Sequence, residues 1–435
     1  MASASVSASL PEALAWLDRH VNVEARAGRV EGLHLDHMRA LMDVLGDPHR
    51  AYPVIHLTGT NGKGSTARMV TQLLVESGLT VGTYTSPHLQ RINERIARNG
   101  EPIDDDDLAE VLTDLEHVEA TLDEAPSYFE LLTAGAYKWF ADVAVDVAVV
   151  EVGLLGRYDA TNIADGIVAV ITNVGHDHSD FTGDWRARIA EEKAGIVKPA
   201  STLVLGETDE ALTPIFYRAG AAEVLERDRD FACEANELAV GGRLLALRTP
   251  GHVVDDVFLP LHGAHQGENA ACALTAAESF FAQPLDEDVI HRGFGAVTMP
   301  GRFEIVRREP LVILDGAHNP EGAAAAAATL REGFTTDGRR VLVVGLLEGR
   351  DPNAILEALD VDDSTFVVAC QPDSPRATNA RVVAEAASAL GATVVEEPDV
   401  TRAVDRALRL ATPDDVVLVT GSLYVIGSAR THLGL

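Results

Sequence analysis

The chain has 435 residues, of which 46% are hydrophobic, and its formal net charge is −32 at pH 7. Nucleic acids and anionic membranes bind basic surfaces, so this charge excludes both as partners. The three cysteines lie far apart without metal-ligand spacing, and no signal-like start or run of about 20 apolar residues is evident, so we expect a cytoplasmic protein.

Lysine is rare in this chain. Only Lys63, Lys138, Lys193 and Lys198 occur among the 35 basic residues. An acid surplus with few lysines indicates a halophilic protein, because high salt screens the repulsion between carboxylates. An ordinary acidic enzyme is the alternative, but it does not explain the lysine deficit.

Residues 11–46 are predicted to be helical, with Gly32 as an interruption. The β-branched run at 54–57 then predicts a buried strand, followed by a turn with Gly59, Gly62 and Gly64 and by a helix from Thr66. Glycines allow backbone N–H groups to approach an anion closely, and a helix start favours negative charge. With Lys63 as a point charge, the turn predicts a triphosphate site.

The turn departs from the usual phosphate-loop pattern, because Gly64 separates Lys63 from Ser65. A plain strand-to-helix turn with a solvated lysine is therefore the alternative. Retention of a lysine where arginine is used almost everywhere else favours the phosphate site.

Three further polar residues follow predicted strands. Ser86 follows a strand at 80–85, Glu151 follows one at 143–150, and His178 follows the apolar run 167–174. The carboxyl ends of parallel strands meet at one edge of a sheet, so these side chains are expected beside the phosphate turn. They can complete the coordination of Mg²⁺ held by phosphate, although imidazole is an unusual ligand for it. A structural histidine and a capping glutamate are the alternatives.

Other acidic and basic groups favour structural interpretations. The acids at 104–107 complement the start of a predicted helix rather than form a metal cluster. His176 and His178 lack a third and fourth ligand at zinc spacing. On the sequence alone, Lys193 in the amphipathic stretch 185–194 is a surface lysine paired with nearby acids.

The second half of the chain contains a β-rich region at 201–260 and then a helix opening at 262–270, where Gln266 and Asn269 either cap the helix or contact a base. Proline and glycine break the pattern near 298–302, so we place a domain boundary between residues 298 and 299. Strands and helices alternate again beyond it, with Asp315 and His318 after a strand end. The predicted fold is α/β, with a P-loop-type parallel-sheet ATPase domain at 1–298 and a smaller Rossmann-like domain at 299–435.

In combination, these motifs resemble the folylpolyglutamate synthase and dihydrofolate synthase family of Mur-type amide ligases. The resemblance spans nearly the whole chain, and its matching segments are 57–65 (LTGTNGKGS), 85–89 (TSPHL), 151–162 (EVGLLGRYDATN), 177–178 (DH), 192–195 (EKAG), 265–266 (HQ) with Asn269, 300–302 (PGR), 315–320 (DGAHNP) and 420–424 (TGSLY). It implies an ATP-dependent ligase that adds L-glutamate to 7,8-dihydropteroate, to reduced folates or to both, through an acyl phosphate.

The resemblance also implies roles for individual residues. ATP would be held by Gly59, Thr60, Asn61, Gly62, Lys63, Gly64, Ser65, Asn269, Arg302 and Asp315. Ser86, Glu151 and His178 would bind Mg²⁺, and Lys193, carbamylated by CO₂, would position a second Mg²⁺. Lys63, Lys193 and His318 would be catalytic. The pterin would lie near Ser127, Tyr128, Phe129, Glu130, Tyr158, Asp159 and Ala160. The expected partners are small molecules, and a monomer is expected.

Three residues depart from the family pattern. Leu155 stands where a second glycine is usual, Tyr158 where leucine is common, and His176 where an apolar residue is usual. These changes spare the implied metal ligands but alter the pterin contacts, and we hypothesise that Tyr158 stacks on the pterin. The alternatives are a Mur ligase for another carboxylate, for which the roughly fifty residues before Gly59 leave too little room for a UDP-binding domain, and a nucleotide-binding module without ligase activity.

Overall fold

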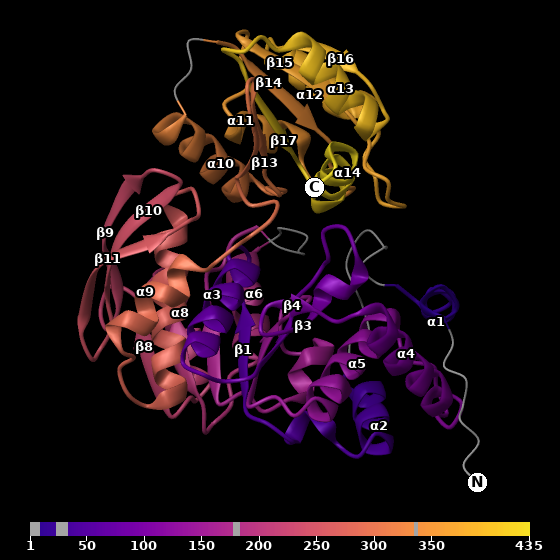
Figure 1. The fold of residues 1–435 in the computed structure, drawn as a ribbon, viewed down its shortest axis with the longest axis vertical. Coiled ribbons are helices and arrows are strands. Elements are labelled where there is room, and N and C mark those ends of the chain that lie inside the picture. Colours follow the sequence, from indigo (N-terminus) through magenta and orange to yellow (C-terminus); the bar gives the residue numbers. More distant parts are fainter. Residues whose placement is uncertain (1–8, 23–33, 177–182, 335–337) are drawn as a thin grey trace.

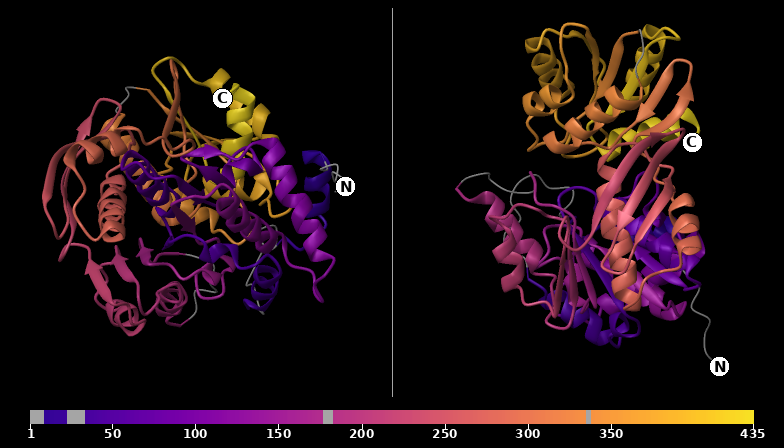
Figure 2. Two further views of the ribbon diagram at one scale, coloured as in Figure 1. Left: turned by 60° about the horizontal axis from the view of Figure 1, so that its bottom comes forward. Right: turned by 90° about the vertical axis from the view of Figure 1, so that its left-hand side faces the viewer.

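The fold is seen in a computed structural model that describes residues 9–22, 34–176, 183–334 and 338–435. Two lobes lie one above the other in Figure 1. The lower lobe holds an eight-stranded and a three-stranded sheet, and the upper lobe holds a six-stranded sheet. The perpendicular view in Figure 2 shows the same division. The α/β class with a parallel-rich first sheet is confirmed.

The first helices are shorter than predicted. α1 (Leu10–Leu17) and α2 (Asp36–Val44) are separate, and residues 18–22 and 34–35 are not helical, so the helical stretch predicted over 11–46, with its interruption at Gly32, was too long. α1 ends at the Asp18 cap and is followed by a turn. Both helices nevertheless bury the predicted apolar faces, including Leu17 and Leu41.

The large sheet has the strand order β4-β3-β2-β5-β1-β6-β7-β8. The bounds are β1 Val54–Thr58, β2 Val81–Tyr84, β3 Ile96–Arg98, β4 Glu101–Pro102, β5 Val147–Glu151, β6 Val168–Ile171, β7 Thr202–Leu205 and β8 Glu223–Glu226. β2, β5, β1, β6, β7 and β8 are parallel, whereas β3 and β4 pair antiparallel. Since β2, β5, β1 and β6 are neighbours, their carboxyl ends form one edge, as the sequence predicts.

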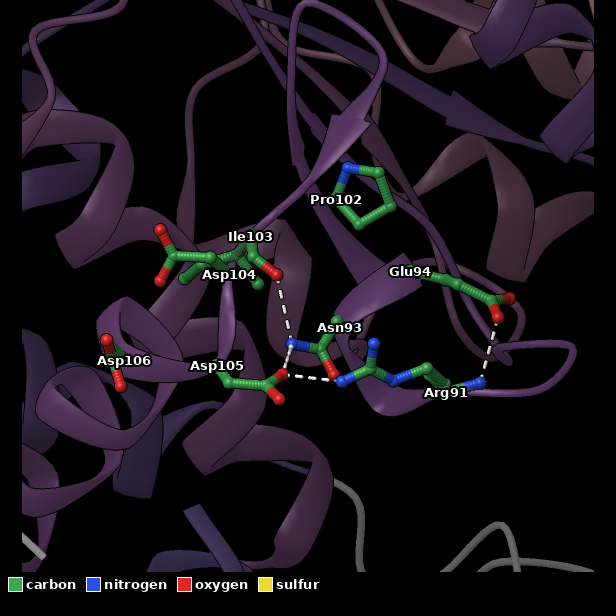
Figure 3. A pocket seen from close by; sticks show the side chains of 8 residues that line it. All are labelled: Arg91, Asn93, Glu94, Pro102, Ile103, Asp104, Asp105 and Asp106. Atoms are coloured by element: carbon green, nitrogen blue, oxygen red, sulfur yellow. Dashed lines mark hydrogen bonds and ion pairs between the residues drawn. The ribbon is translucent and has the colours of Figure 1, made fainter. Parts of the chain in front are cut away.

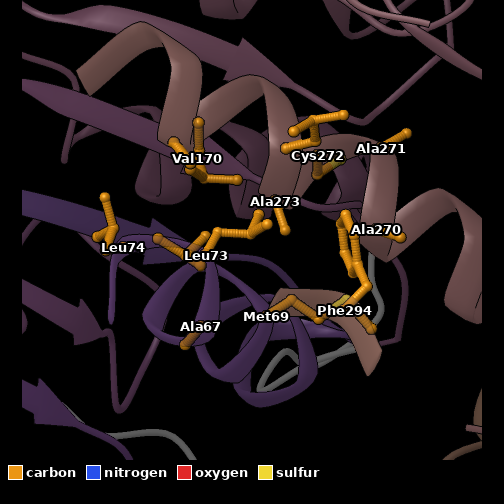
Figure 4. Packing of buried hydrophobic residues seen from close by; sticks show 14 of the residues in the cluster. Ala67, Met69, Leu73, Leu74, Val170, Ala270, Ala271, Cys272, Ala273 and Phe294 are labelled. Atoms are coloured by element: carbon orange, nitrogen blue, oxygen red, sulfur yellow. The ribbon is translucent and has the colours of Figure 1, made fainter. Parts of the chain in front are cut away.

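Helices cover both faces of this sheet. α3 (Lys63–Glu76), α8 (His265–Phe281) and α9 (Glu287–Gly295) pack over one face, where Met69, Leu73, Ala273 and Phe294 meet in Figure 4. α4 (Asp105–Glu119) and α5 (Tyr128–Asp142) pack over the other face together with α1 and α2. Burial on both faces explains why most residues of β1 and β5 are apolar.

The remaining elements of the lower lobe follow β6 in the sequence. α6 (Trp185–Ala194) and α7 (Thr213–Arg218) pack beside β6 and β7. The strands β9 (Ala232–Ala239), β10 (Gly242–Arg248) and β11 (Val253–Leu259) form the antiparallel three-stranded sheet, which packs on α8.

The upper lobe has the strand order β12-β13-β17-β14-β15-β16. Its strands are β12 Glu304–Arg308, β13 Leu311–Leu314, β14 Arg340–Val344, β15 Thr365–Ala369, β16 Thr393–Glu396 and β17 Val416–Thr420, and its helices are α10 Pro320–Gly333, α11 Pro352–Ala358, α12 Ala380–Ala389, α13 Val400–Leu410 and α14 Leu423–Leu433. Only the edge strand β12 is antiparallel, and its charged sequence gave no strand signal. Among the described residues, no helix has the length and apolar character needed to cross a bilayer.

Candidate active site

The glycine turn between β1 and α3 forms a cradle. α3 begins at Lys63, earlier than the predicted Thr66, and its N-cap Gly62 has φ +84°. A Cβ at Gly62 would collide with Asn269 Oδ1, and a Cβ at Gly59 would collide with Thr172 Oγ1. Only glycine therefore fits these positions, and the start of a 14-residue helix opens onto the turn, a geometry that suits a phosphate.

Lys63 lies over this turn. Its Nζ donates to Gly59 O at 2.9 Å and to Thr60 O at 3.2 Å. The ammonium is thus held by the backbone of the turn itself rather than solvated at a distance from it.

Two other predicted strand ends converge on the turn. Glu151, at the end of β5, is only 5% exposed and accepts a hydrogen bond from Ser86 N at 3.3 Å. A Cβ at Gly64 would lie 3.4 Å from Glu151 Oε2. Burial raises the pKa of Glu151, and the charge of Lys63 opposes that rise. His178, the fourth predicted member, lies outside the described residues.

The upper lobe supplies Arg302, Asp315 and His318. Arg302 packs against Gly316, and its charge, like that of Lys63, opposes the raised pKa of Glu151. Asp315 accepts hydrogen bonds from Phe303 N and Ala317 N, both at 2.9 Å. The upper lobe therefore brings an arginine and a carboxylate to the edge of the lower sheet.

His318 is half-buried, with Nδ1 2.9 Å from Gly316 O. Burial, followed by the positive charges of Arg350, Arg302 and Lys63, lowers the pKa of His318 to about 3. The imidazole is consequently neutral near pH 7 and lies within the electrostatic reach of Lys63 across the two lobes.

Asn269 lies within α8 and does not cap it, since the N-cap is Ala264. It is buried beneath Gly62, and its Nδ2 donates to Gln266 Oε1 at 3.0 Å. The capping interpretation of Gln266 and Asn269 was wrong, because both are buried in the first turns of the helix next to the phosphate turn.

Lys193 is fully buried in α6, so the interpretation as a surface lysine was also wrong. The loop after β5 covers the end of this helix: Arg157 N donates to Glu192 O at 2.9 Å, and Asn162 Nδ2 donates to Gly195 O at 3.0 Å. A Cβ at Gly195 would collide with Arg157. This close approach is what buries Lys193, and no periodicity in the sequence signals it.

The residues predicted to contact a pterin come from two adjacent segments. The Phe129 ring lies directly over Gly153. This contact joins the start of α5 to the loop that carries Tyr158. Ser127 and Glu130 bond to each other in the α5 cap, with Ser127 N donating to Glu130 Oε2 at 2.7 Å. Among the seven, Tyr158 is the large side chain that is most exposed, at 45%, whereas Tyr128, Asp159 and Ala160 are buried.

Two of the departures from the family pattern have visible consequences. Leu155 has φ +59°, a conformation that favours glycine and costs a leucine about 1 kcal/mol. The His176 ring lies 4.8 Å from the Trp185 ring and pairs with Glu321 of α10. His176 thus contacts the upper lobe.

The acidic run at 104–107 starts a helix, as predicted. Asp104 caps α4 by accepting from Asp107 N at 2.8 Å. Figure 3 shows a pocket beside it, lined by Arg91, Asn93, Glu94, Pro102, Ile103, Asp104, Asp105 and Asp106. Asp105 accepts from Arg91 and Asn93 within that pocket. Across the described ranges, no group of three or more His, Cys, Asp or Glu side chains is arranged to hold a metal on its own.

Comparisons with known proteins identify the family. Residues 57–277 match the Mur ligase middle domain, and residues 301–423 match the Mur ligase glutamate ligase domain. A dihydrofolate synthase/folylpolyglutamate synthase of Mycobacterium tuberculosis is 42% identical over 92% of this chain and 90% of its own. The chain belongs to the dihydrofolate synthase/folylpolyglutamate synthase family of Mur ligases.

Solved structures of the family have the same fold. A Mycobacterium tuberculosis folylpolyglutamate synthase complexed with ADP and AMPPCP is 40% identical, with a TM-score of 0.91 over 98% of both chains. A bifunctional folylpolyglutamate synthase/dihydrofolate synthase with Mn, AMPPNP and L-glutamate bound is 28% identical, with a TM-score of 0.86 over 100% of both chains. These related enzymes bind adenine nucleotides and a divalent metal.

Proposed function

We propose that this chain is an ATP-dependent amide ligase that joins L-glutamate to 7,8-dihydropteroate, to the glutamate tail of reduced folates, or to both. The carrying observation is the convergence of the phosphate turn, Glu151 and Ser86 with Arg302 and His318 of the other lobe, in a chain of this family. Site residues from two lobes suit a reaction that joins two substrates across a cleft.

The chemistry requires activation of a carboxylate, because it is a poor electrophile. The γ-phosphoryl group of ATP passes to the substrate carboxylate, breaking its bond to ADP and forming an acyl phosphate. The amine of L-glutamate then attacks the acyl carbon, phosphate leaves, and the amine loses a proton. Lys63 and the backbone N–H groups of residues 62–65, at the start of α3, hold the phosphates and neutralise the charge that develops on them.

The adenine nucleotide also contacts residues outside the turn. Asn269 lies beneath Gly62, and Arg302 and Asp315 approach from the upper lobe. His318 is neutral near pH 7, and because its Nδ1–H donates to Gly316 O, its Nε2 is left as an acceptor that adds no positive charge beside the phosphates. These residues complete the predicted ATP site.

Ser86 and Glu151 offer the oxygen ligands that Mg²⁺ prefers, and His178 is assigned to the same ion. A bound Mg²⁺ supplies Lewis-acid stabilisation of the phosphoryl oxygens. Lys193 is assigned as a carbamate: its amine adds to CO₂, forming an N–C bond and losing a proton, which turns a buried cation into a carboxylate-like ligand for a second Mg²⁺.

The pterin is assigned to the junction of the start of α5 with the loop carrying Tyr158. Tyr158 stacks on the pterin, because it presents an exposed ring in the loop that follows the Phe129–Gly153 contact along the chain. We place the domain boundary at 298/299, and we expect a monomer that works in a salt-rich cytoplasm.

The test measures ADP release in high KCl with Mg²⁺ and L-glutamate, using dihydropteroate or tetrahydrofolate as acceptor, with products identified by mass. Turnover with both acceptors establishes a bifunctional enzyme, and turnover with one assigns a single activity. If ADP binds but neither acceptor gains glutamate, the folate assignment is wrong and the enzyme acts on another carboxylate. Tyr158→Ala with unchanged pterin affinity contradicts the stacking role.

A further inference from the structure

One buried side chain joins the two lobes at the phosphate turn. Asn319 is 2% exposed, and its Oδ1 accepts from Gly322 N at 2.8 Å, which caps α10. Its Nδ2 donates to Asn61 Oδ1 at 2.9 Å, in the turn of the lower lobe. The same residue therefore fixes the start of a C-terminal helix and contacts the proposed ATP site.

Asn61 is itself held from the side of β6. Its N–H donates to Asn173 Oδ1 at 2.9 Å. Its carbonyl accepts from Thr172 Oγ1 at 2.6 Å and from Asn173 Nδ2 at 3.0 Å. Because the backbone of Asn61 is fixed in this way, its side chain offers the upper lobe a rigid point of contact.

α10 also docks on the lower lobe through other residues. In Figure 1 it lies on the border of the upper lobe that faces the lower one. Glu321 in its first turn pairs with His176, and Glu332 near its end accepts from the fully buried Arg243 at 2.7 Å. These contacts attach the helix without touching the phosphate turn, whereas Asn319 bonds directly to it.

We propose that the Asn61–Asn319 bridge couples docking of the C-terminal domain to the geometry of the phosphate turn. Both are positioning residues. Asp315 and His318 precede Asn319 on the same short loop. The hydrogen bond from Asn319 to Asn61 therefore fixes where Asp315 and His318 lie relative to the phosphate turn. The inference rests on the proposed ligase function and concerns the phosphoryl-transfer step and the exclusion of water from the acyl phosphate.

The decisive variant is Asn319→Ser. Serine keeps an acceptor for the α10 cap but is too short to reach Asn61. Asn379→Ser is the matched control, because Asn379 caps α12 through Arg381 N at 2.9 Å, a bond that stays within the C-terminal domain. The unfolding midpoints of both variants should stay close to that of the wild-type protein and close to each other.

With Mg·ATP, L-glutamate and the acceptor on which the wild-type enzyme turns over, Asn319→Ser should lower kcat about tenfold, the effect of losing one hydrogen bond in the transition state. Its Kd for ADP should stay within about twofold of wild type, since the glycine cradle is intact. Undocked enzyme exposes the acyl phosphate to water, so more than one ADP should be released per amide formed. Asn379→Ser should behave as wild type in all three measurements.

The bridge itself is tested by a double-mutant cycle. Asn61→Ala should lower kcat as Asn319→Ser does, and the double variant should be no worse than either single variant. Additive losses would show that the two residues act independently, which overturns the proposal. So would an Asn319→Ser enzyme with wild-type kcat and one ADP per amide. Failure of the proposed function is distinct, because wild-type enzyme would then form no glutamylated product.

Discussion

A glycine pair at opposite ends of α3 permits a sharp test of the phosphate cradle. Gly62 at the N-cap has φ +84°, and Gly78 just after the C-cap has φ +90°. A Cβ at Gly78 would have no heavy atom within 4 Å, whereas one at Gly62 would collide with Asn269 Oδ1. Changing either glycine to alanine imposes the same left-handed strain, about 1–2 kcal/mol. The two variants share the backbone strain and differ in the collision and in their distance from the phosphate turn.

The collision should appear in nucleotide affinity. Gly62→Ala must displace Asn269 from Gln266 Oε1, at a cost of about 1 kcal/mol for the lost hydrogen bond, and must shift the turn whose N–H groups face the phosphate. We expect its Kd for ADP to rise at least about tenfold, which corresponds to 1.4 kcal/mol. Gly78→Ala should lower the unfolding midpoint by a few degrees and leave the Kd unchanged.

Isothermal titration of ADP in the presence of Mg²⁺ and high KCl measures the affinities, and urea unfolding gives the stabilities. Equal ADP affinity for the two variants would refute the cradle, because the collision would then have no consequence for the ligand. A loss of affinity in Gly78→Ala as large as in Gly62→Ala would also refute it, since helix strain alone would then account for the effect.

Three further predictions concern a buried histidine, the buried lysine and salt. Burial lowers the pKa of His56 to about 3, so its contribution to stability is complete above pH 6.5 and is lost as the pH falls towards 3; at pH 5 the loss is about 2 kcal/mol. Between pH 7 and pH 5, urea titrations followed by tryptophan fluorescence should show a loss about 2 kcal/mol larger in wild type than in His56→Gln, because other histidines with a lowered pKa, such as His318, titrate in both; equal losses would contradict it. Lys193→Arg cannot form a carbamate and should lower kcat about 100-fold. The control Lys138→Arg should keep the wild-type kcat, because Lys138 makes only surface ion pairs with Asp114 and Asp142 among the contacts described. A Lys193→Arg enzyme with wild-type kcat would exclude the carbamate. Raising KCl from about 0.2 M to about 2 M should raise the unfolding midpoint, because salt screens the charge of −32, and a midpoint that falls with KCl would rule out adaptation to high salt.

The sequence predicted best those parts of the fold that depend on local signals. β1 (Val54–Thr58) matches the strand predicted at 54–57, whereas β5 (Val147–Glu151) begins four residues later than the predicted 143–150, because Val143 is the C-cap of α5. The strand β12 was missed because three of its five residues, Glu304, Arg307 and Arg308, are charged, which hides its pairing with β13. The helical residues predicted within 11–46 were too many because apolar periodicity does not show where the helix Leu10–Leu17 ends or where Asp36–Val44 begins.

The parts of the site that the sequence did not predict depend on contacts between distant segments. Lys193 is buried by the loop that precedes it by about thirty residues, through hydrogen bonds to backbone carbonyls that any residue at 191–195 can provide. Asn319 lies inside the quoted 315–320 motif, and its position before a proline gives a helix-cap signal. Its second bond, to Asn61, spans 258 residues and has no sequence signature.

The rarity of lysine is therefore informative only when combined with position. Lys138 and Lys198 pair with carboxylates near the surface, where arginine would serve as well. Lys63 is bonded to two carbonyls of a turn that has no space for a side chain at Gly59 or Gly62, and Lys193 is wholly enclosed. The proposed carbamate requires an amine at the second position, because a guanidinium does not add CO₂. The two lysines that the proposed chemistry uses are thus the one bonded to the phosphate turn and the one fully buried in α6.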